Sequence, residues 1–562
     1  MLRFYLLSLI TLCCFCYPSI TNAQDVEQTL NTVKTRIKDP VKVSGGLAFG
    51  LQFSDISGAP ARFDGFDWNF RAQLTLDVLG VQAPFSAIIS DRNRLYNLPS
   101  YQFLGFSPRY KWATLHAGDR SMNFNQYTFS NQLFRGVGLE LTPGKWRFAG
   151  MRGRLNRLQL GDFNARQDLE ISYRRMGWAA EAGYAEEVFD VKFILFGAED
   201  QLAGVMDSLT LSGLAPARNL VGSVEAGVEL LPNLTLRSTF AHSWITDNTL
   251  AAGVPDSMAN SFINANASTS RETAFNSSLN FSLPKSNWQL TYERISPNYR
   301  SLGTLFITPD RENVTLGSAF TLGEGKATLS LSGGLQRTNL ADKRTNTQRR
   351  IIAQVAGSVK LSDQLSASAN LSNFLNTTRL RSFFDPLSST DSIFLAQVNS
   401  SGRIGLRWQR PKDKPQGSWN LDLSVQDARS IQDDVLTDFS SRTYNLFFGY
   451  AAQAPGSRLT YRAQILLGMT DAGALDNTII SPSIGLSRSF KDDKLVLGLT
   501  SSYSFVDYAT RGPGGVWLSR LTGGLPLLTN GRLQAYLQYT RRNLGEASFS
   551  EIIAALNYNW NF

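Results

Sequence analysis

The chain has 562 residues, a charged content of 18% and a formal net charge of +9 at pH 7. The basic residues are scattered singly through strand-like segments and do not cluster on one element, so the charge does not predict nucleic-acid binding. After the N-terminal segment, no stretch approaches the roughly 20 consecutive apolar residues of a spanning helix, which excludes a helical membrane protein.

Residues 1–23 have the pattern of a secretory signal peptide. One basic residue, Arg3, precedes a short apolar stretch, and a small-x-small exit ends at Ala23. We therefore expect export and cleavage before Gln24.

All three cysteines of the chain lie within this expected signal peptide. The mature protein is therefore predicted to have no disulfide and no thiol that binds a metal or acts as a nucleophile. The cysteines do not follow the small residues of a lipoprotein signal, so a lipid-attached cysteine is the minor alternative. The cysteines are Cys13, Cys14 and Cys16.

Residues 24–40 form the one stretch with a clear helical pattern. Their apolar residues recur at spacings of three and four, which places them on one face of a helix before Pro40 ends it. We expect a short periplasmic helix here. The residues on this face are Val26, Leu30, Val33 and Ile37.

Residues 41–562 read as strands, with apolar and polar residues alternating at period two. The clearest hairpin covers residues 272–293 and turns at 284–287. From this hairpin to the C-terminus, short turns alternate strictly with longer polar connections. Transmembrane barrels require this alternation, whereas a soluble β-sandwich does not. Because each unpaired backbone group in hydrocarbon costs several kcal/mol, the sheet must close on itself.

The fold prediction is therefore all-β, a large antiparallel transmembrane β-barrel of about 26 strands. An even number returns the C-terminus to the periplasmic side. If Arg109 to Arg135 folds into the lumen instead, 22 or 24 strands fit. The predicted strands as far as the hairpin above are 41–54, 66–79, 84–92, 109–117, 121–129, 136–142, 146–154, 167–174, 178–197, 219–230, 233–244 and 272–283.

The C-terminal strand alternates to a terminal aromatic through Tyr558, Trp560 and Phe562. This motif resembles the last strand of Gram-negative outer-membrane β-barrel proteins. The resemblance implies an outer-membrane location and recognition by the barrel-assembly machinery. Two further stretches, Phe106–Trp112 and Arg135–Trp146, look like poorly characterised barrels of Bacteroidota, which suggests a lineage and assigns no activity.

TonB-dependent receptors also have large barrels, but they carry an N-terminal plug of well over one hundred residues. Strand alternation here begins at about residue 41, so residues 24–40 are too few for such a plug. We also expect no enzymatic activity, cofactor or metal site. The two histidines, His116 and His242, have no sequence neighbours that suggest a catalytic triad or a ligand set.

Seven basic residues lie in the inward phase of their predicted strands. A lipid-facing arginine at mid-bilayer costs about 2–4 kcal/mol, whereas a lumen arginine stays hydrated. These charges either stiffen the wall as ladders or bias conduction toward anions. Glu293, Asp422 and Gln464 are inward neighbours that could pair with them. The seven are Arg350, Lys360, Arg403, Arg407, Arg458, Arg462 and Arg532.

The predicted function is an outer-membrane channel or transport barrel that passes solutes or a larger cargo. The alternative is a structural or interaction barrel that anchors an outer-membrane complex or secretion machine. Because a barrel above 20 strands is wide, we expect its lumen to be partly blocked by loops 246–271 or 376–391, by the 25–38 helix, or by another protein. Expected partners are outer-membrane lipids, the assembly machinery and a periplasmic or outer-membrane protein.

Overall fold

The computed structural model describes most of the chain after residue 40. The described ranges are 41–60, 65–78, 80–91, 102–158, 172–202, 214–253, 264–344, 346–380, 393–411, 416–432, 435–436, 440–490, 494–510, 512–544 and 547–562. The predicted signal peptide and N-terminal helix lie outside these residues. Within them, no helix has the length and apolar character to cross a membrane.

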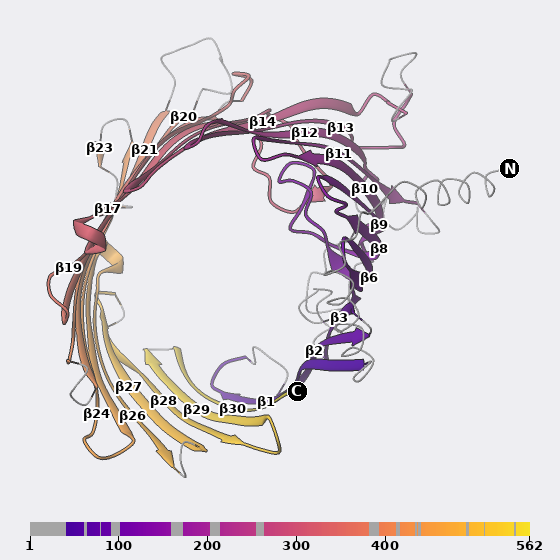
Figure 1. Ribbon diagram of the computed structural model, residues 1–562. Helices are drawn as coiled ribbons and strands as arrows, with labels where there is room; N and C mark the ends of the chain where they lie inside the picture. Colours follow the sequence, from indigo (N-terminus) through magenta and orange to yellow (C-terminus); the bar gives the residue numbers. More distant parts are fainter. Residues whose placement is uncertain are drawn as a thin grey trace.

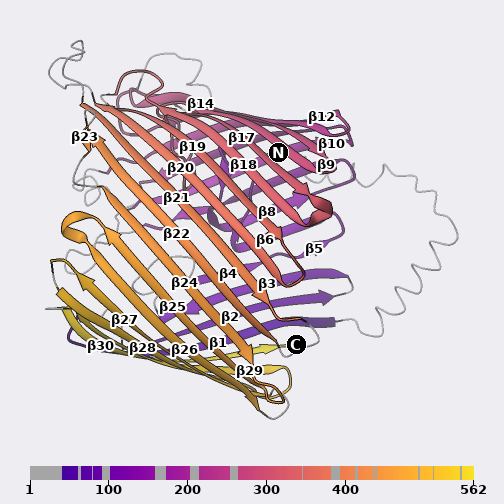
Figure 2. The ribbon, with the colours of Figure 1, turned by 90° about the vertical axis from the view of Figure 1, so that its left-hand side faces the viewer.

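All named strands except β7 and β16 form one closed antiparallel barrel, seen end-on in Figure 1 and from the side in Figure 2. Two short 3-10 turns, Gly323–Gly325 and Gly473–Leu475, lie between strands. The strands are β1 (Val41–Ser57), β2 (Phe66–Val78), β3 (Val81–Ser90), β4 (Gln102–Phe106), β5 (Arg109–Tyr110), β6 (Ala113–Ser121), β7 (Phe129–Ser130), β8 (Leu133–Leu141), β9 (Trp146–Asn156), β10 (Arg174–Ala185), β11 (Phe189–Gln201), β12 (Arg218–Leu231), β13 (Leu234–Thr246), β14 (Thr269–Leu283), β15 (Ser286–Ile295), β16 (Gly303–Thr304), β17 (Arg311–Leu322), β18 (Ala327–Thr338), β19 (Asn346–Lys360), β20 (Leu365–Leu380), β21 (Ile393–Gln409), β22 (Gly417–Gln432), β23 (Val435–Leu436), β24 (Ser441–Gln453), β25 (Leu459–Asp471), β26 (Asn477–Phe490), β27 (Leu495–Tyr508), β28 (Gly512–Pro526), β29 (Gly531–Leu544) and β30 (Ala547–Asn561).

The wall has 26 strands, as predicted. The sheet contains 28 named strands; β4 and β5 both pair with β3 and β6 as halves of one interrupted strand, and β23 only extends the end of β22. Subtracting one for each leaves 26. The short turns lie at the end where β30 finishes, so this end is periplasmic and the other is extracellular.

The barrel closes where β30 pairs antiparallel with β1. The last residue takes part, since Phe562 N–H donates to the Gly45 carbonyl at 3.0 Å and Gly45 N–H donates to the Phe562 carbonyl at 2.8 Å. Gly45 has a positive φ, and a Cβ atom there would lie 2.1 Å from the Gln73 carbonyl oxygen. A larger residue at position 45 would therefore clash with the backbone of β2, on the side of β1 away from the seam.

The outer face is an apolar belt. Large apolar side chains on this face are highly exposed, such as Phe53 at 60% and Ile484 at 63%. Near the extracellular end, outward positions become charged, for example where Asp427 pairs with Arg429 and Arg442. An exposed apolar belt that ends in charges is what a bilayer requires of a spanning barrel.

The strand number is correct, although several predicted segments differ from the observed strands. The predicted strand 109–117 crosses the turn between β5 and β6, and 178–197 contains the turn between β10 and β11. The latter was missed because its Glu186-Glu187 sequence carries no Gly or Pro. Residues 102–106 form the unpredicted β4, residues 121–129 leave the wall, and 167–174 lies mostly outside the described residues.

Candidate functional site

Two extracellular connections fold into the barrel. The first inward segment (122–132) joins β6 to β8, and the second (296–310) joins β15 to β17. Figure 1 shows both inside the ring of strands. The tips of the two inward segments pair with each other. The pairing strands, β7 and β16, have two residues each and run parallel, with Phe129 opposite Gly303. The alternative that Arg109 to Arg135 folds into the lumen applies only to residues 122–132, and the wall still has 26 strands.

These contacts identify the inner face of every strand. Asn125 of the first inward segment donates from its amide to the Ser223 hydroxyl of β12 at 2.8 Å, so Ser223 faces the lumen. Directly opposed residues of neighbouring antiparallel strands lie on the same face. Following the register from Ser223 through Ala241, Ala274 and Ile295 therefore traces the lumen side around the barrel.

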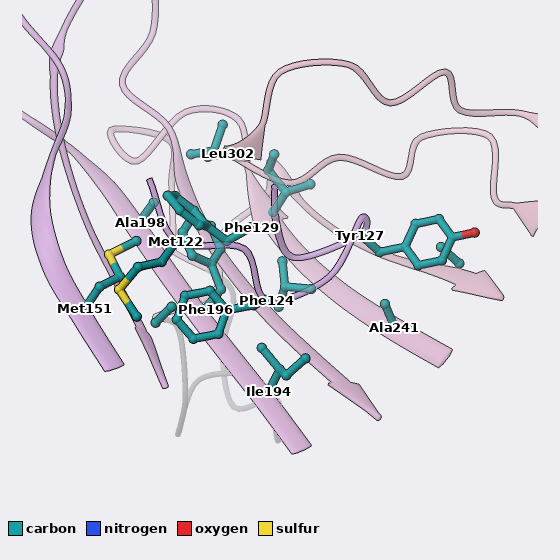
Figure 3. Close-up of a cluster of buried hydrophobic side chains, with 14 of the residues drawn as sticks. Met122, Phe124, Tyr127, Phe129, Met151, Ile194, Phe196, Ala198, Ala241 and Leu302 are labelled. Carbon is teal, nitrogen blue, oxygen red and sulfur yellow. The ribbon is translucent and has the colours of Figure 1, made fainter. Parts of the chain in front are cut away.

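Where the inward segments cover it, the lumen side of β8 to β15 carries large apolar residues, whereas period-two alternation alone predicts a polar inner face. The physical reason is that the inward segments cover it and form a core inside the barrel (Figure 3). Alanines in the wall leave space for the larger side chains. The core comprises Met122, Phe124, Tyr127, Phe129, Phe134, Ala149, Met151, Ala179, Ile194, Phe196, Ala198, Ala217, Val221, Ala241, Ile245, Ala274, Ile295, Tyr299 and Leu302.

Phe129 is the centre of this core. It is fully buried, and its ring lies 5.7 Å from the ring of Phe196, 6.3 Å from that of Phe134 and 6.1 Å from that of Phe124. Opposite it, Gly303 leaves no space for a side chain, since a Cβ atom would lie 2.5 Å from the Thr128 carbonyl oxygen. The second inward segment therefore packs with its backbone against the first.

A buried polar network also holds the first inward segment. The Tyr127 hydroxyl donates to a Glu293 carboxylate oxygen of β15 at 2.8 Å, and Arg311 of β17 pairs with the same carboxylate at 2.9 Å. Burial raises the pKa of the Tyr127 phenol well above its ordinary value, and the neighbouring Glu293 charge raises it further. The phenol therefore stays protonated and keeps its role as donor.

The two inward segments also bind each other and the wall through hydrogen bonds. The Tyr299 hydroxyl donates to the Tyr127 carbonyl at 2.9 Å, and the Ser301 hydroxyl donates to the Thr128 carbonyl at 2.5 Å. On the wall side, Leu302 N–H donates to the Asn219 side-chain oxygen at 3.0 Å. Burial, ring packing and hydrogen bonds together make the inward segments a fixed part of the lumen.

The two inward segments are not among those that the sequence predicted to block the lumen, which were loops 246–271 and 376–391 and the 25–38 helix. The described parts of loop 246–271 hydrogen-bond to each other and extend the β13–β14 hairpin, for example from Ala267 N–H to the Ala252 carbonyl at 3.1 Å. Loop 376–391 begins as the end of β20, and its residues 381–391 lie outside the described residues, as does the 25–38 helix.

The register places six of the seven predicted basic residues on the same face as Ser223, and the seventh, Arg458, lies in the turn before β25. Arg403 pairs with Asp422 at 2.9 Å. Arg350 donates to Gln336 and Gln348, each at 3.2 Å. Glu293, also considered as a partner for the seven, pairs with Arg311 instead. The remaining members are Lys360, Arg407, Arg458, Arg462 and Arg532.

The inner wall is asymmetric in charge. On the plugged side, β9 to β13, basic and acidic residues pair across strands near the periplasmic end. These pairs are Arg147–Glu181 at 2.7 Å, Lys192–Glu225 at 3.2 Å, Arg237–Asp190 at 2.8 Å and Arg237–Glu225 at 2.9 Å. On the other side, β18 to β29, the described inward residues include one acidic residue, Asp422. The basic ones are Arg350, Lys360, Arg403, Arg407, Arg462, Arg520, Arg532 and Arg542, with Arg458 in the turn before β25.

His116 has partners that sequence spacing did not reveal. Its Nδ1 lies 2.8 Å from the Ser107 hydroxyl, and its Nε2 lies 3.6 Å from a Glu140 carboxylate oxygen. The residue types are those of a hydrolase triad. However, Ser107 is 8% exposed and lies at the interruption between β4 and β5, where its N–H donates to the Pro84 carbonyl. The Ser107 hydroxyl and His116 Nδ1 therefore lie in contact at a strand break where the serine is buried, which does not favour a catalytic role.

His242 lies on the outer face, with its ring 4.2 Å from that of Trp244. Within the described ranges, no group of three or more His, Cys, Asp or Glu residues is arranged to hold a metal ion.

Taken together, the closed antiparallel wall, its even strand number and its apolar outer belt define an outer-membrane β-barrel. The predicted outer-membrane location is confirmed.

No protein-family model and no curated protein matches the sequence. Among solved structures, a mutant of the ferric enterobactin receptor of Pseudomonas aeruginosa matches with a TM-score of 0.41 and 9% identity, over 93% of this chain and 80% of that one. OccAB2 of Acinetobacter baumannii matches with a TM-score of 0.28 and 11% identity, over 62% and 93%. A BenF-like porin from Pseudomonas fluorescens Pf-5 has values of 0.27 and 12%, over 62% and 92%. Nothing about substrate follows from these similarities.

Proposed function

We propose that this barrel conducts small anionic solutes across the outer membrane, through the part of the lumen that the inward segments leave free. The observation that carries the proposal is the excess of basic residues on the inner face of β18 to β29. We name this face the basic wall. It contains the eight basic strand residues given above and Asp422 as its acidic residue.

The exposure of the basic wall supports a hydrated path beside it. The Arg403 side chain is 65% exposed even though it pairs with Asp422. Arg407, Arg462, Arg520 and Arg532 are also exposed. Charged side chains on a pore wall attract ions of opposite sign and repel those of the same sign. Because the charges of the opposite wall pair with one another, the basic wall dominates the field in the lumen.

The inward segments support a restricted rather than a fully open pore. Barrels of 16 to 18 strands already leave an aqueous channel, so an empty barrel of 26 strands would pass large molecules. The core around Phe129 fills one side of the lumen and narrows the path toward the basic wall. An anchoring or secretion role with a partner protein is the alternative, and absence of conductance would favour it.

Neutralising three arginines of the basic wall tests this proposal. We expect Arg403→Gln, Arg407→Gln and Arg462→Gln together to lower the ratio of chloride to potassium permeability, measured from reversal potentials in planar bilayers. A charge about 10 Å away changes the free energy of an ion by about 0.4 kcal/mol in water, so each arginine contributes about twofold to the local ion concentration.

The matched control removes three arginines of the outer face, Arg349→Gln, Arg488→Gln and Arg541→Gln, which have the opposite strand phase. This control changes the net charge equally and should keep the wild-type permeability ratio. An unchanged ratio in the lumen variant, or an equal decrease in both variants, would contradict the proposal.

We also propose that Tyr558, Trp560 and Phe562 are recognised by the barrel-assembly machinery. The Trp560 and Phe562 rings lie 4.6 Å apart on the outer face of the seam, where a partner can reach them. Deletion of Phe562 should therefore reduce the folded barrel in outer-membrane fractions several-fold, while export to the periplasm stays normal. Phe490→Ala, which alters an outward aromatic near the same end of β26, is the control. Normal insertion of the deletion variant would refute the assignment.

A further inference from the structure

A cluster of arginines lies on the outer face of the barrel near the extracellular end of β8, β9 and β10. Its members alternate with residues of the internal core: Phe134 and Met151 face inward, so their neighbours Arg135 and Arg152 face outward. We call this set the outer arginine cluster. It comprises Arg135, Arg152, Arg154, Arg157 and Arg174.

The outer arginine cluster has more positive charge than its neighbours neutralise. Asp119 pairs with Arg135, at 2.6 Å and 2.5 Å to the two carboxylate oxygens, and Arg157 donates to Gln102 at 2.8 Å. Within the described part of the chain, the other three members form no ion pair. Arg152 and Arg174 are exposed.

Like charges are crowded in this cluster. Arg154 lies directly opposite Arg135 in the register of β8 and β9, and Arg157, Arg135 and Arg174 are all near enough to repel its charge. Like charges opposite each other on a sheet destabilise it. A bound anion between the guanidinium groups would remove this repulsion, and arginine binds phosphate through two parallel hydrogen bonds.

An apolar groove on the outer face begins directly below the cluster. Leu115, Val137, Leu139 and Phe148 line it, and Arg152 stands at its end. Small residues such as Gly150 form its floor. The groove and the cluster together match a molecule with an acyl chain and an anionic headgroup. At this height on the barrel, such a molecule is a lipid of the outer leaflet.

We propose that the outer arginine cluster binds the phosphate groups of an outer-leaflet lipid whose acyl chain lies in the groove. The site is separate from the lumen, so it does not depend on the proposed conduction. Each arginine near an anionic lipid surface contributes about fivefold to binding. Removal of the three unpaired members should therefore weaken lipid retention by about a hundredfold.

The test uses the purified full-length barrel with lipid A, a bis-phosphorylated glycolipid, and with the same lipid after enzymatic removal of its phosphates. Native mass spectrometry counts the lipid molecules retained as the lipid is diluted with neutral detergent. The wild-type protein should retain the phosphorylated lipid in strong preference to the dephosphorylated one. Arg152→Gln, Arg154→Gln and Arg174→Gln together should abolish this preference.

The matched control combines Arg271→Gln, Arg442→Gln and Arg541→Gln, which removes three outward arginines dispersed over β14, β24 and β29. It should retain the phosphorylated lipid as the wild type does. If the triple cluster variant does not fold, as judged by its mobility in unheated gels, Arg154→Gln alone should still lose about fivefold. Equal retention of both lipids, equal loss in cluster and control variants, or full displacement by inorganic phosphate would overturn the proposal.

Discussion

Replacing Phe129 with alanine should release the first inward segment and raise the single-channel conductance several-fold. Phe129 is fully buried between Phe196, Phe134 and Phe124, and a buried Phe→Ala substitution costs about 3–5 kcal/mol. The loss falls on the contact between the segment and the wall, because the wall strands keep all their backbone hydrogen bonds. Planar-bilayer recordings of the variant and the wild type measure the effect.

The control for this variant is Phe53→Ala. Phe53 is 60% exposed on the outer face, and its ring lies 6.4 Å from that of Phe66. The Phe53→Ala substitution removes the same side-chain volume from the outer apolar belt and should leave the single-channel conductance unchanged. A Phe129→Ala barrel that folds and conducts like the wild type would show that the internal core does not limit the pore.

Replacing Glu293 with leucine should make the first inward segment sensitive to protease. The substitution leaves Arg311 without its carboxylate and the Tyr127 hydroxyl without its acceptor. Removing one partner of a buried ion pair costs about 3–5 kcal/mol, because the other charge stays buried and unpaired. Chymotrypsin should then cut at Tyr127 or Phe129, and mass spectrometry of the fragments would locate the cuts.

Glu225→Leu is the appropriate comparison. Glu225 faces the same lumen wall and pairs with Lys192 and Arg237, away from the inward segments. Its loss should break wall ion pairs and leave the first inward segment protected. Cleavage in both variants, or in neither, would mean that the Tyr127–Glu293–Arg311 network does not fix the segment.

The barrel could be predicted because one face of most strands meets lipid and the other meets water. In β26 exposed and half-buried residues alternate along almost the whole strand, as period two requires. The prediction of 26 strands rests partly on errors that offset each other. Missing the turn inside 178–197 and the strand β4 lowered the count, and treating 121–129 as a strand raised it.

The internal core could have been suspected from β11. Phe193, Ile194, Leu195 and Phe196 are four consecutive apolar residues. Phe193 and Leu195 are 57% and 52% exposed on the outer belt, whereas Ile194 and Phe196 are 1% and 0% exposed against the inward segments. A continuous apolar run indicates a strand that is covered on both faces, so it signals a filled lumen.

The partner of the first inward segment could not be predicted from sequence. Tyr299 and Tyr127 are 172 residues apart, and β7 and β16 pair through only two residues each. Such short pairing leaves no periodic pattern. For this reason residues 296–311 read as an ordinary polar connection. The inward phase of Arg403 and Asp422 was readable from alternation, but their ion pair depends on the register between β21 and β22.

The reversal potential of the wild-type barrel in a potassium chloride gradient tests the central claim most directly. The basic wall predicts a shift toward the equilibrium potential of chloride, and the shift should decrease as salt screens the wall charges. A shift toward the equilibrium potential of potassium, a reversal potential of zero, or no conductance at all would contradict the account of this barrel as a partly filled pore for anions.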